Sequence, residues 1–282
     1  MSWLVTGGGG QLGSALQILL RASGADFSAP AHAELDICDD AQLARAFTRA
    51  SPRVVVNCAA LTKVDTCERE PALAERANAT AVAALARACA ASGARLVQLS
   101  TDYVFAGDAQ RQLREDDAPA PRSVYGRTKL AGERAALAAP GALVVRTSWV
   151  YGRGRNFPAA ILAQAREGKP LRVVADQRGR PTYAADLARA ITQLVDAGAS
   201  GIVNFANDGE ATWLEFARAV LDSCGFADRP IEPLTTEQLG LPAPRPRHSV
   251  LDLSKARALG LAPRDWRAAL AAYLASPDAP SA

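Results

Sequence analysis

The segment Trp3-Leu4-Val5-Thr6-Gly7-Gly8-Gly9-Gly10-Gln11-Leu12-Gly13 joins a short apolar run to the start of a helical pattern. Gly7, Gly10 and Gly13 have the spacing G-x-x-G-x-x-G. Gly7 permits a sharp turn, Gly10 lets an anion approach the backbone, and Gly13 allows close packing of helix on strand. A flexible turn would explain glycines alone. A glycine turn between a first strand and a first helix favours dinucleotide binding, because the helix N-terminus offers unpaired N–H donors to a pyrophosphate.

The composition of the 282 residues excludes several classes of protein. Hydrophobic residues make up 49% of the chain and charged residues 22%, which is typical of a large globular unit and not of a disordered chain. The net charge is only +3 and the basic residues are scattered, so we expect no nucleic-acid partner. No apolar run approaches the roughly 18 residues of a membrane span, so we expect no membrane partner.

The cysteines indicate the compartment. The five cysteines are odd in number and form no C-x-x-C pair, and the chain has only two histidines. This pattern predicts free thiols and no metal site. Because the N-terminal residues also lack the pattern of a signal peptide, we expect a cytoplasmic protein.

The rest of the chain alternates short β-branched apolar runs with longer amphipathic patterns, which predicts βαβ units on a parallel sheet. We expect strands at Trp3–Val5, Asp26–Ser28, Val54–Val56, Arg95–Leu99, Leu143–Arg146, Leu171–Val174 and Ile202–Phe205. We expect helices at Gln11–Ala22, Ala41–Ala50, Ala72–Ala91, Val124–Leu137, Phe157–Gly168, Ala184–Val195, Trp213–Cys224 and Asp265–Ala275. The predicted fold class is α/β, a doubly wound Rossmann-type parallel sheet with a smaller C-terminal substrate-binding region.

Two segments interrupt this alternation, Asp108–Arg122 and Arg229–Ser249. The first is polar and contains proline, and the second contains five prolines that argue against helix. We expect both segments to be loops on the substrate side.

The residues that would recognise the adenosine ribose are not evident. An acidic residue about 20 residues after the glycine turn usually binds the ribose diol, but Ser28-Ala29-Pro30 stands there. No arginine in that stretch could bind a 2′-phosphate, so the sequence does not choose between NADH and NADPH. Asp36 and Ile37 flank the adenine in one interpretation, and in the other Asp36 caps the helix that starts near Asp39.

Tyr125 and Lys129 are four residues apart and share one face of a predicted helix. A lysine ammonium stabilises a phenolate and lowers the pKa of the tyrosine, which makes the phenol a useful proton donor. An ordinary exposed pair would have the same spacing. The stretch Ser100-Thr101-Asp102 favours the catalytic interpretation, because it follows a strand at the edge where open α/β sheets bind ligands. A simple turn is the alternative there.

Two asparagines stand near this predicted site. Asn57-Cys58-Ala59-Ala60 ends another strand with small side chains that suit close approach of a cofactor. Asn78 lies in the middle of a predicted helix. We expect it to be a buried polar bracket between strands rather than a solvated surface residue.

These motifs resemble the extended short-chain dehydrogenase/reductase superfamily and, within it, the dTDP-4-dehydrorhamnose reductase family. The resemblance runs nearly end to end. It is carried by the glycine turn, Leu35-Asp36-Ile37, Val55-Val56-Asn57-Cys58-Ala59-Ala60, Ser100-Thr101-Asp102-Tyr103-Val104-Phe105, Tyr125-Gly126-Arg127-Thr128-Lys129, Arg146-Thr147-Ser148-Trp149-Val150-Tyr151, Asp176-Gln177-Arg178-Gly179-Arg180-Pro181-Thr182 and Arg245-Pro246-Arg247. The last three motifs mark the narrower family, because the glycine turn and Y-x-x-x-K are common to the superfamily.

The resemblance implies an oxidoreductase that reduces the C4 ketone of dTDP-4-dehydro-6-deoxy-L-mannose to dTDP-L-rhamnose, the last step of dTDP-rhamnose synthesis for cell-surface polysaccharide. Hydride would come from NADPH or NADH. Tyr125 would protonate the ketone oxygen, and Lys129 would lower the pKa of Tyr125 and hold the cofactor ribose. Thr101 would hydrogen-bond the same oxygen or orient the sugar. The implied cofactor contacts are Gly7, Gly10, Gln11, Leu12, Gly13, Asp36, Ile37, Cys58, Ala59, Ala60, Leu61, Thr62, Tyr125 and Lys129.

The resemblance also implies a set of contacts to the dTDP-sugar. These are Thr101, Asp102, Tyr125, Trp149, Asn156, Gln177, Arg178 and Arg247. Trp149 stacks on sugar or base in one interpretation and packs in the core in the other. Arg247 pairs with a phosphate, or is simply exposed. We expect residues 1–150, with a strand and helix from 183–206, to bind the dinucleotide, and residues 151–282 mainly to bind the nucleotide sugar.

The chain departs from the family pattern at three places. Some family members form homodimers through Mg²⁺ held by glutamates, one of them on the first helix, where this chain has Ser14 and Ala15. We therefore expect no metal ligands and a monomer or a weak homodimer. Leu61 stands where the family often has tyrosine or histidine, and Lys63 replaces its usual alanine, which predicts a locally different cofactor pocket.

Two other functions remain open from the sequence. One is a different nucleotide-sugar epimerase, dehydratase or reductase on the same scaffold, although Asp102-Tyr103 lacks the acidic pair of dehydratases. The other is a non-catalytic regulatory subunit that binds the dinucleotide. The intact Thr101, Tyr125 and Lys129 favour an enzyme.

Overall fold

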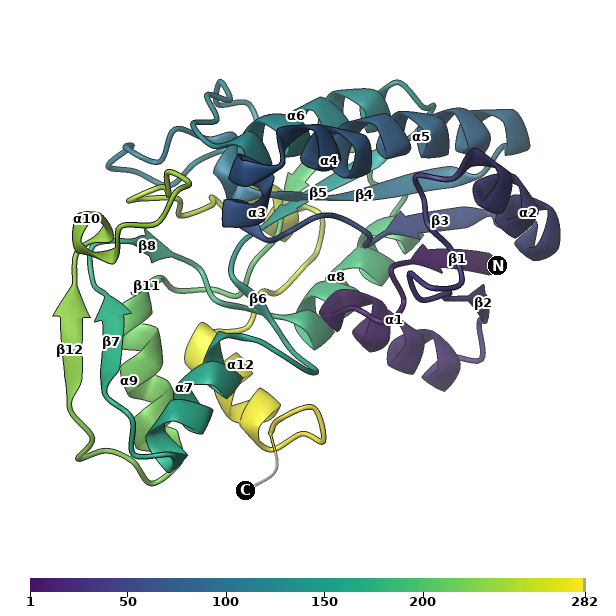
Figure 1. Ribbon diagram of the computed structural model, residues 1–282. Coiled ribbons are helices and arrows are strands. Elements are labelled where there is room, and N and C mark those ends of the chain that lie inside the picture. The colour runs from purple at the N-terminus through teal and green to yellow at the C-terminus, as the bar shows by residue number, and fades with distance from the viewer. Residues whose placement is uncertain (281–282) are drawn as a thin grey trace.

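The computed structural model describes residues 1–280, and a six-stranded parallel sheet lies at its centre (Figure 1). Residues 281 and 282, the end of the expected sugar-binding region, lie outside the described part. The strands lie in the order β10 (Gly201–Asn204), β5 (Leu143–Thr147), β4 (Arg95–Thr101), β3 (Val54–Asn57), β1 (Ser2–Thr6) and β2 (Asp26–Ser28). The order reverses between β1 and β3, and at such a reversal doubly wound sheets bind ligands.

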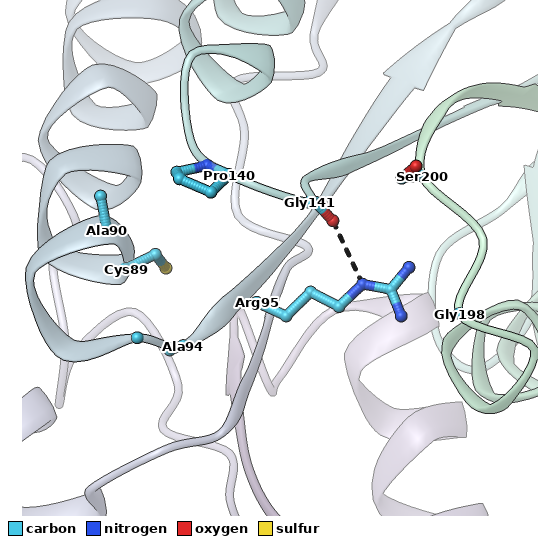
Figure 2. A pocket seen from close by; sticks show the side chains of 9 residues that line it. Cys89, Ala90, Ala94, Arg95, Pro140, Gly141, Gly198 and Ser200 are labelled. Carbon is cyan, nitrogen blue, oxygen red and sulfur yellow. Dashed lines mark hydrogen bonds between the residues drawn. The ribbon is translucent and has the colours of Figure 1, made fainter.

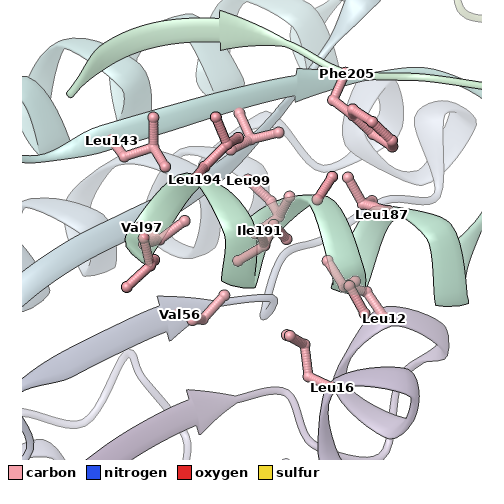
Figure 3. Packing of buried hydrophobic residues seen from close by; sticks show 14 of the residues in the cluster. Leu12, Leu16, Val56, Val97, Leu99, Leu143, Leu187, Ile191, Leu194 and Phe205 are labelled. Carbon is pink, nitrogen blue, oxygen red and sulfur yellow. The ribbon is translucent and has the colours of Figure 1, made fainter. Parts of the chain in front are cut away.

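Helices cover both faces of this sheet. α1 (Gln11–Ala22) and α8 (Ala184–Asp196) pack on one face, and α2 (Asp40–Ala50), α5 (Ala81–Ser92) and α6 (Val124–Leu137) pack on the other. Figure 3 shows the first interface, where Leu16 of α1, Ile191 of α8 and Val56 of β3 belong to one buried cluster. Successive strand residues face opposite sides, so buried valines and leucines fill both cores. The predicted fold class is confirmed.

A smaller region lies at one end of the sheet (Figure 1). It contains three strand pairs, which are β6 (Val150–Tyr151) with β9 (Thr182–Tyr183), β7 (Leu171–Val174) with β12 (Ile231–Leu234), and β8 (Arg178–Gly179) with β11 (Ala211–Thr212). Helices α7 (Phe157–Arg166), α9 (Trp213–Ser223) and α12 (Trp266–Leu274) surround its core. That core is aromatic, with Tyr151, Tyr183, Phe216, Trp266 and Tyr273 all buried. α8 and β10 return from this region to the central sheet.

Leu171–Val174 is a strand with the predicted bounds, and it pairs in parallel with β12 in the smaller region. The prediction for the segment 229–249 is wrong. The segment 229–249 is not one loop, since it contains β12 and the short α10 (Thr236–Leu239). Pro233 is tolerated because β12 pairs only with β7 among the described strands, so a missing N–H costs no ladder bond. Thr235 caps α10 in a capping box with Gln238.

The predicted helix over residues 72–91 is interrupted. α4 (Pro71–Glu75) leads into a π-helical turn, η1 (Arg76–Thr80), before α5 begins. The π turn places the side chain of Asn78 against neighbouring backbone, where it makes three hydrogen bonds. π turns inside α-helices often lie at functional sites. Two further helices, α3 (Val64–Arg69) and α11 (Ser254–Ala258), and the 3₁₀ turn η2 (Asp102–Val104) were not predicted.

None of the helices within residues 1–280 has the length and apolar character needed to cross a bilayer.

Candidate active site

The glycine turn connects β1 to α1 in the conformation that the sequence predicts. Gly7 has φ +67°, and a Cβ placed on it would lie 2.9 Å from the Ala59 nitrogen. A Cβ on Gly13 would lie 2.3 Å from the Gly7 oxygen, and one on Gly8 would lie 2.1 Å from the Ala29 oxygen. The sequence analysis did not single out Gly8. The turn is therefore pressed between the loops after β2 and β3, with no room for side chains.

The N-terminus of α1 fits a pyrophosphate. Its N-cap residue, Gly10, makes no side-chain cap, and the first turn holds no acidic residue. The backbone N–H groups and the positive end of the helix dipole are thus available to an anion. Leu12 is buried in the core, so it can meet a ligand only through its backbone. The Gln11 amide donates to the Arg155 oxygen at 3.0 Å and ties α1 to the C-terminal region.

The loop after β2 borders a groove of about 750 Å³, lined in part by Ser28, Ala29 and Pro30. Arg45 and Arg49 of α2 line the same groove. No ion pair joins either arginine to another described residue. Neither arginine is close to residue 30 in the chain, so the sequence pattern does not point to them, and the packing of α2 brings them there.

Asp36 does not cap α2, so that alternative is wrong. Asp39 caps the helix and accepts from the Ala41 and Gln42 N–H groups. Asp36 instead accepts from the Cys38 N–H at 2.9 Å, which fixes the loop after Leu35. The side chain of Ile37 is buried beneath this loop.

The loop after β3 is held by two buried asparagines. Asn57 Oδ1 accepts from the Ala59 N–H at 3.3 Å, which places Ala59 against the glycine turn. Asn78 accepts from the Leu61 N–H at 2.8 Å and donates to the Leu61 oxygen at 3.0 Å and to Thr128 Oγ1 at 3.2 Å. Asn78 is buried as predicted, but its hydrogen bonds join the loop after β3 to α6 and do not lie between two strands. Cys58, Ala59 and Ala60 are half-buried and Thr62 is exposed.

Thr101, Tyr125 and Lys129 come together at the carboxyl end of β4. The Thr101 hydroxyl lies close enough to the Tyr125 phenol to act on its pKa. Lys129 follows one turn later on α6, and its Nζ donates to the Leu99 oxygen at 2.6 Å. The Lys129 ammonium also acts electrostatically on Cys58 of the loop after β3. The structure thus links the predicted catalytic residues to the loop that borders the glycine turn.

Burial dominates the pKa values at this site. It raises the pKa of Tyr125, and the Thr101 hydrogen bond opposes that shift. It lowers the pKa of Lys129 to about 8. The effect predicted for Lys129 on the pKa of Tyr125 is not found, because the groups that shift this pKa are Thr101, Asp102 and Cys67. The Lys129 ammonium points instead to the carbonyl of Leu99.

Asp102 is buried directly behind Thr101. Its Oδ1 accepts from Thr101 Oγ1 at 3.0 Å, and its Oδ2 accepts from Ser249 Oγ at 2.5 Å. Burial raises the pKa of Asp102 to about 6. Sequence analysis missed Ser249, and nothing in the sequence pattern connects it to a position 147 residues earlier.

Two tryptophans of the C-terminal region, Trp149 and Trp213, form a stacked pair. Trp149 has φ +46°, a strained conformation for a bulky residue, and stacks on Trp213 with ring centroids 3.7 Å apart. A Cβ on Gly179 would lie 2.7 Å from the Trp149 indole. Gln177 accepts from Trp213 Nε1 at 3.2 Å and donates to Thr236 Oγ1 at 3.0 Å. Gln177 therefore fixes the orientation of the Trp213 ring and, through the stacking, that of Trp149.

The remaining predicted sugar contacts have different surroundings. Asn156 caps α7 by accepting from the Ala159 N–H, and its Nδ2 donates to the Tyr273 hydroxyl at 2.9 Å, so its amide is engaged inside the protein. Arg178 is partly exposed, and its Nη1 lies 3.5 Å from Glu210 Oε1. Arg247 is exposed, and its backbone oxygen accepts from the Arg178 N–H at 2.8 Å. The two arginines therefore lie side by side.

A separate cavity of about 440 Å³ lies at the other end of the sheet (Figure 2). Its lining includes Cys89, Arg95 and Gly141, and Arg95 Nε donates to the Gly141 oxygen at 3.3 Å. Arg95 begins β4 and Gly141 precedes β5, so this cavity borders the amino ends of the strands. It is remote from Thr101, which ends β4.

Residues 1–280 contain no cluster of three or more histidine, cysteine, aspartate or glutamate side chains that could hold a metal ion.

Comparisons with known proteins agree with this geometry. The model of the family described as "RmlD substrate binding domain" matches residues 1–278. A dTDP-4-dehydrorhamnose reductase from Mycobacterium tuberculosis H37Rv is 45% identical over 97% of this chain and 92% of its own length.

Two solved structures have the same fold along nearly the whole chain. The dTDP-4-dehydrorhamnose reductase of Clostridium acetobutylicum superposes with a TM-score of 0.94 at 36% identity, covering 98% of this chain and 99% of that one. The enzyme of the same name from Bacillus anthracis, solved in complex with NADP, also has a TM-score of 0.94, at 35% identity and coverage of 97% and 98%. The chain is similar to proteins named dTDP-4-dehydrorhamnose reductase and belongs to the RmlD substrate binding domain family.

Proposed function

We propose that this chain reduces the C4 ketone of dTDP-4-dehydro-6-deoxy-L-mannose to dTDP-L-rhamnose with NADPH or NADH. The observation that carries the proposal is the close approach of Thr101 and Tyr125 at the carboxyl end of β4, in a chain of this family. The relatives named dTDP-4-dehydrorhamnose reductase support the substrate.

The protein residues act on the proton and on the geometry of the reaction. The nicotinamide, when bound, supplies hydride to the ketone carbon. Tyr125 donates its phenolic proton to the ketone oxygen as negative charge develops there, and Thr101 beside it orients the sugar. The Leu99 carbonyl holds the Lys129 ammonium at this edge of the sheet, where Lys129 would hold the cofactor ribose.

Residues 1–150, with α8 and β10, would bind the dinucleotide. Its pyrophosphate would lie on Gly10, Gln11 and the following N–H groups of α1, and its adenosine would reach the loops that carry Asp36 and Ala59. Residues 151–282 would mainly bind the nucleotide sugar. Arg178 and Arg247 would pair with the diphosphate of the nucleotide sugar. Trp149 would line its sugar or base, and Gln177 would orient Trp149 through Trp213.

The groove beside the loop after β2 supports a preference for NADPH. Arg45 and Arg49 have no ion-pair partner among the described residues and line the groove with Ser28. A guanidinium there would bind a 2′-phosphate, which NADH lacks. We expect Arg45→Ala to raise the KM for NADPH about tenfold and leave the KM for NADH nearly unchanged. Arg53→Ala serves as the matched control, and an equal loss with both cofactors would contradict the assignment.

We also propose that the enzyme works in the cytoplasm as a monomer or a weak homodimer without Mg²⁺. Ser14 and Ala15 of α1 provide no carboxylate for a metal bridge. Turnover and sedimentation should therefore be the same with and without EDTA.

The proposal is tested by following absorbance at 340 nm. The keto-sugar is made in situ from the dehydrated glucose nucleotide by its 3,5-epimerase, and NADPH and NADH are supplied in parallel. Oxidation that requires the epimerase, with dTDP-rhamnose as product, is the expected result. Dinucleotide binding without oxidation would instead favour another nucleotide sugar or the regulatory subunit.

A further inference from the structure

Two hydroxyl groups provide the main hydrogen bonds to the Asp102 carboxylate. Thr101 Oγ1 donates to one oxygen at 3.0 Å and Ser249 Oγ to the other at 2.5 Å. Thr101, Asp102 and Ser249 are 5%, 2% and 1% exposed. No lysine, arginine or histidine in residues 1–280 forms an ion pair with this carboxylate. A carboxylate removed from water needs such donors, so each hydroxyl matters to its charge.

Ser249 reaches Asp102 from a segment that is fixed on both sides. The Ser249 N–H donates to the Arg178 oxygen at 2.9 Å, and the His248 N–H donates to the Gly107 oxygen at 2.9 Å. The same segment carries Arg247, a proposed phosphate contact. The Ser249 hydroxyl therefore meets Asp102 at a defined place and joins the substrate segment to β4.

The single hydroxyl hydrogen of Thr101 is directed to Asp102. Thr101 Oγ1 accepts from the Tyr103 N–H at 3.2 Å, and the same oxygen faces the Tyr125 phenol. A hydroxyl has one hydrogen to donate and two lone pairs. While Asp102 is ionised, its carboxylate therefore holds the Thr101 hydrogen and keeps the hydroxyl oxygen in place beside Tyr125.

We propose that Asp102 and Ser249 are a positioning pair for the reduction. Ser249 holds the Asp102 carboxylate, and that carboxylate fixes the direction of the Thr101 hydroxyl beside Tyr125. The inference rests on the proposed function, but it changes the part expected of Asp102. Both of its oxygens are engaged inside the protein, so it acts through Thr101 and does not bind the sugar.

Other titratable groups surround this cluster. Tyr103 and Tyr125 pack against each other in a T-shaped pair, and burial raises the pKa of both. Lys129 lies one turn along α6, and the Asp65–Arg245 ion pair lies beyond Tyr103. Burial lowers the pKa of His248, so His248 needs its own control.

The test is the pH dependence of kcat at saturating NADPH and keto-sugar. Burial raises the pKa of Asp102 to about 6 and the Ser249 bond opposes the shift. Wild-type kcat should therefore fall as the pH drops through about 6, because protonation removes the acceptor for Thr101. Ser249→Ala should move this fall to higher pH by about one unit, and Ser249→Thr should restore it.

Asp102→Asn should abolish the acid fall, lower kcat about tenfold and leave the KM for the keto-sugar within about threefold of wild type. His248→Gln should keep the fall at the wild-type pH. An unchanged acid limb in Ser249→Ala would overturn the proposal. A raised KM with unchanged kcat in Asp102→Asn would also overturn it and make Asp102 a sugar contact.

A second measurement separates this inference from the proposed function. The pKa of Asp102 is higher in the folded protein than in the unfolded chain, so the folded state binds the proton more tightly. The free energy of unfolding of wild type, relative to that of Asp102→Asn, should therefore fall as the pH rises between about 4 and 6. Ser249→Ala should extend that range upward. If wild type does not oxidise NADPH, the proposed function and the catalytic role of the pair both fail, whereas a flat stability difference would refute the Ser249–Asp102 coupling itself.

Discussion

Tyr125 owes its place to its immediate neighbours in α6. The Ser123 hydroxyl caps the helix by accepting from the Gly126 N–H at 3.1 Å. A Cβ on Gly126 would lie 2.2 Å from the Tyr103 oxygen, so only glycine lets the helix approach the loop after β4 this closely. That approach brings the phenol within reach of Thr101.

Tyr125→Phe removes the proposed proton donor and keeps the ring. We expect kcat to fall about 100-fold or more, because loss of a general acid typically costs two to four orders of magnitude. NADPH affinity, measured by fluorescence titration, should not change. Tyr183→Phe, which removes a phenol from the C-terminal core, is the matched control. Wild-type turnover in Tyr125→Phe would remove Tyr125 from the mechanism.

Lys129 makes turnover sensitive to alkaline pH. Burial lowers the pKa of Lys129 to about 8, so the ammonium loses its proton as the pH rises through that value. We expect kcat to fall on the alkaline side, because an uncharged lysine holds the cofactor ribose less firmly. Lys129→Arg keeps its charge at all these pH values, so its lower kcat should show no such fall. A wild-type rate that stays level to pH 9.5 would contradict this account.

At the scale of elements, the contact between the glycine turn and α1 sets dinucleotide binding. Gly13→Ala places a methyl group 2.3 Å from the Gly7 oxygen, so the helix must move away from the turn. We expect NADPH affinity, measured by calorimetry, to fall at least about tenfold. Gly9→Ala is the control, since its Cβ would have an ordinary contact of 3.6 Å with Ala31. Equal affinities of the two variants would show that the close packing does not position the pyrophosphate site.

A buried ion pair joins Glu133 of α6 to Arg146 of β5. Arg146 and Glu133 are each 1% exposed and form two parallel hydrogen bonds of 2.8 Å. Arg146→Met leaves the Glu133 carboxylate buried without its partner, which should lower the free energy of unfolding by about 3–5 kcal/mol. Urea denaturation would measure this loss, and the double variant with Glu133→Leu should recover much of it. A single variant as stable as wild type would show that water or another group replaces Arg146.

At the scale of the whole molecule, the sequence predicts whatever depends on local pattern. The alternation of apolar strands with amphipathic helices predicts the six sheet strands, even Asp26–Ser28 with its weak side chains. Spacing within one element also predicts that Tyr125 and Lys129 share a face of α6. Position after a strand predicts that Thr101 joins them, because parallel strands end at one edge.

Contacts between distant segments could not be predicted in this way. Ser249 meets Asp102, and Arg45 lines the groove beside Ser28, only because the tertiary fold brings them there. The π turn around Asn78 also depends on partners outside its helix, namely the Leu61 backbone and Thr128. Pairing of Leu171–Val174 with β12 depends on a proline-containing partner that the local pattern does not mark as a strand.

The central claim is direct hydride transfer to the sugar ketone with proton donation by this chain. Its most direct test uses NADPH carrying deuterium at the transferable position, with the keto-sugar generated in situ, and product analysis by NMR. The account predicts dTDP-L-rhamnose with one deuterium at C4 of the sugar, formed about 100-fold or more slowly by Tyr125→Phe. Deuterium at another carbon, or no reduced sugar despite tight NADPH binding, would contradict it.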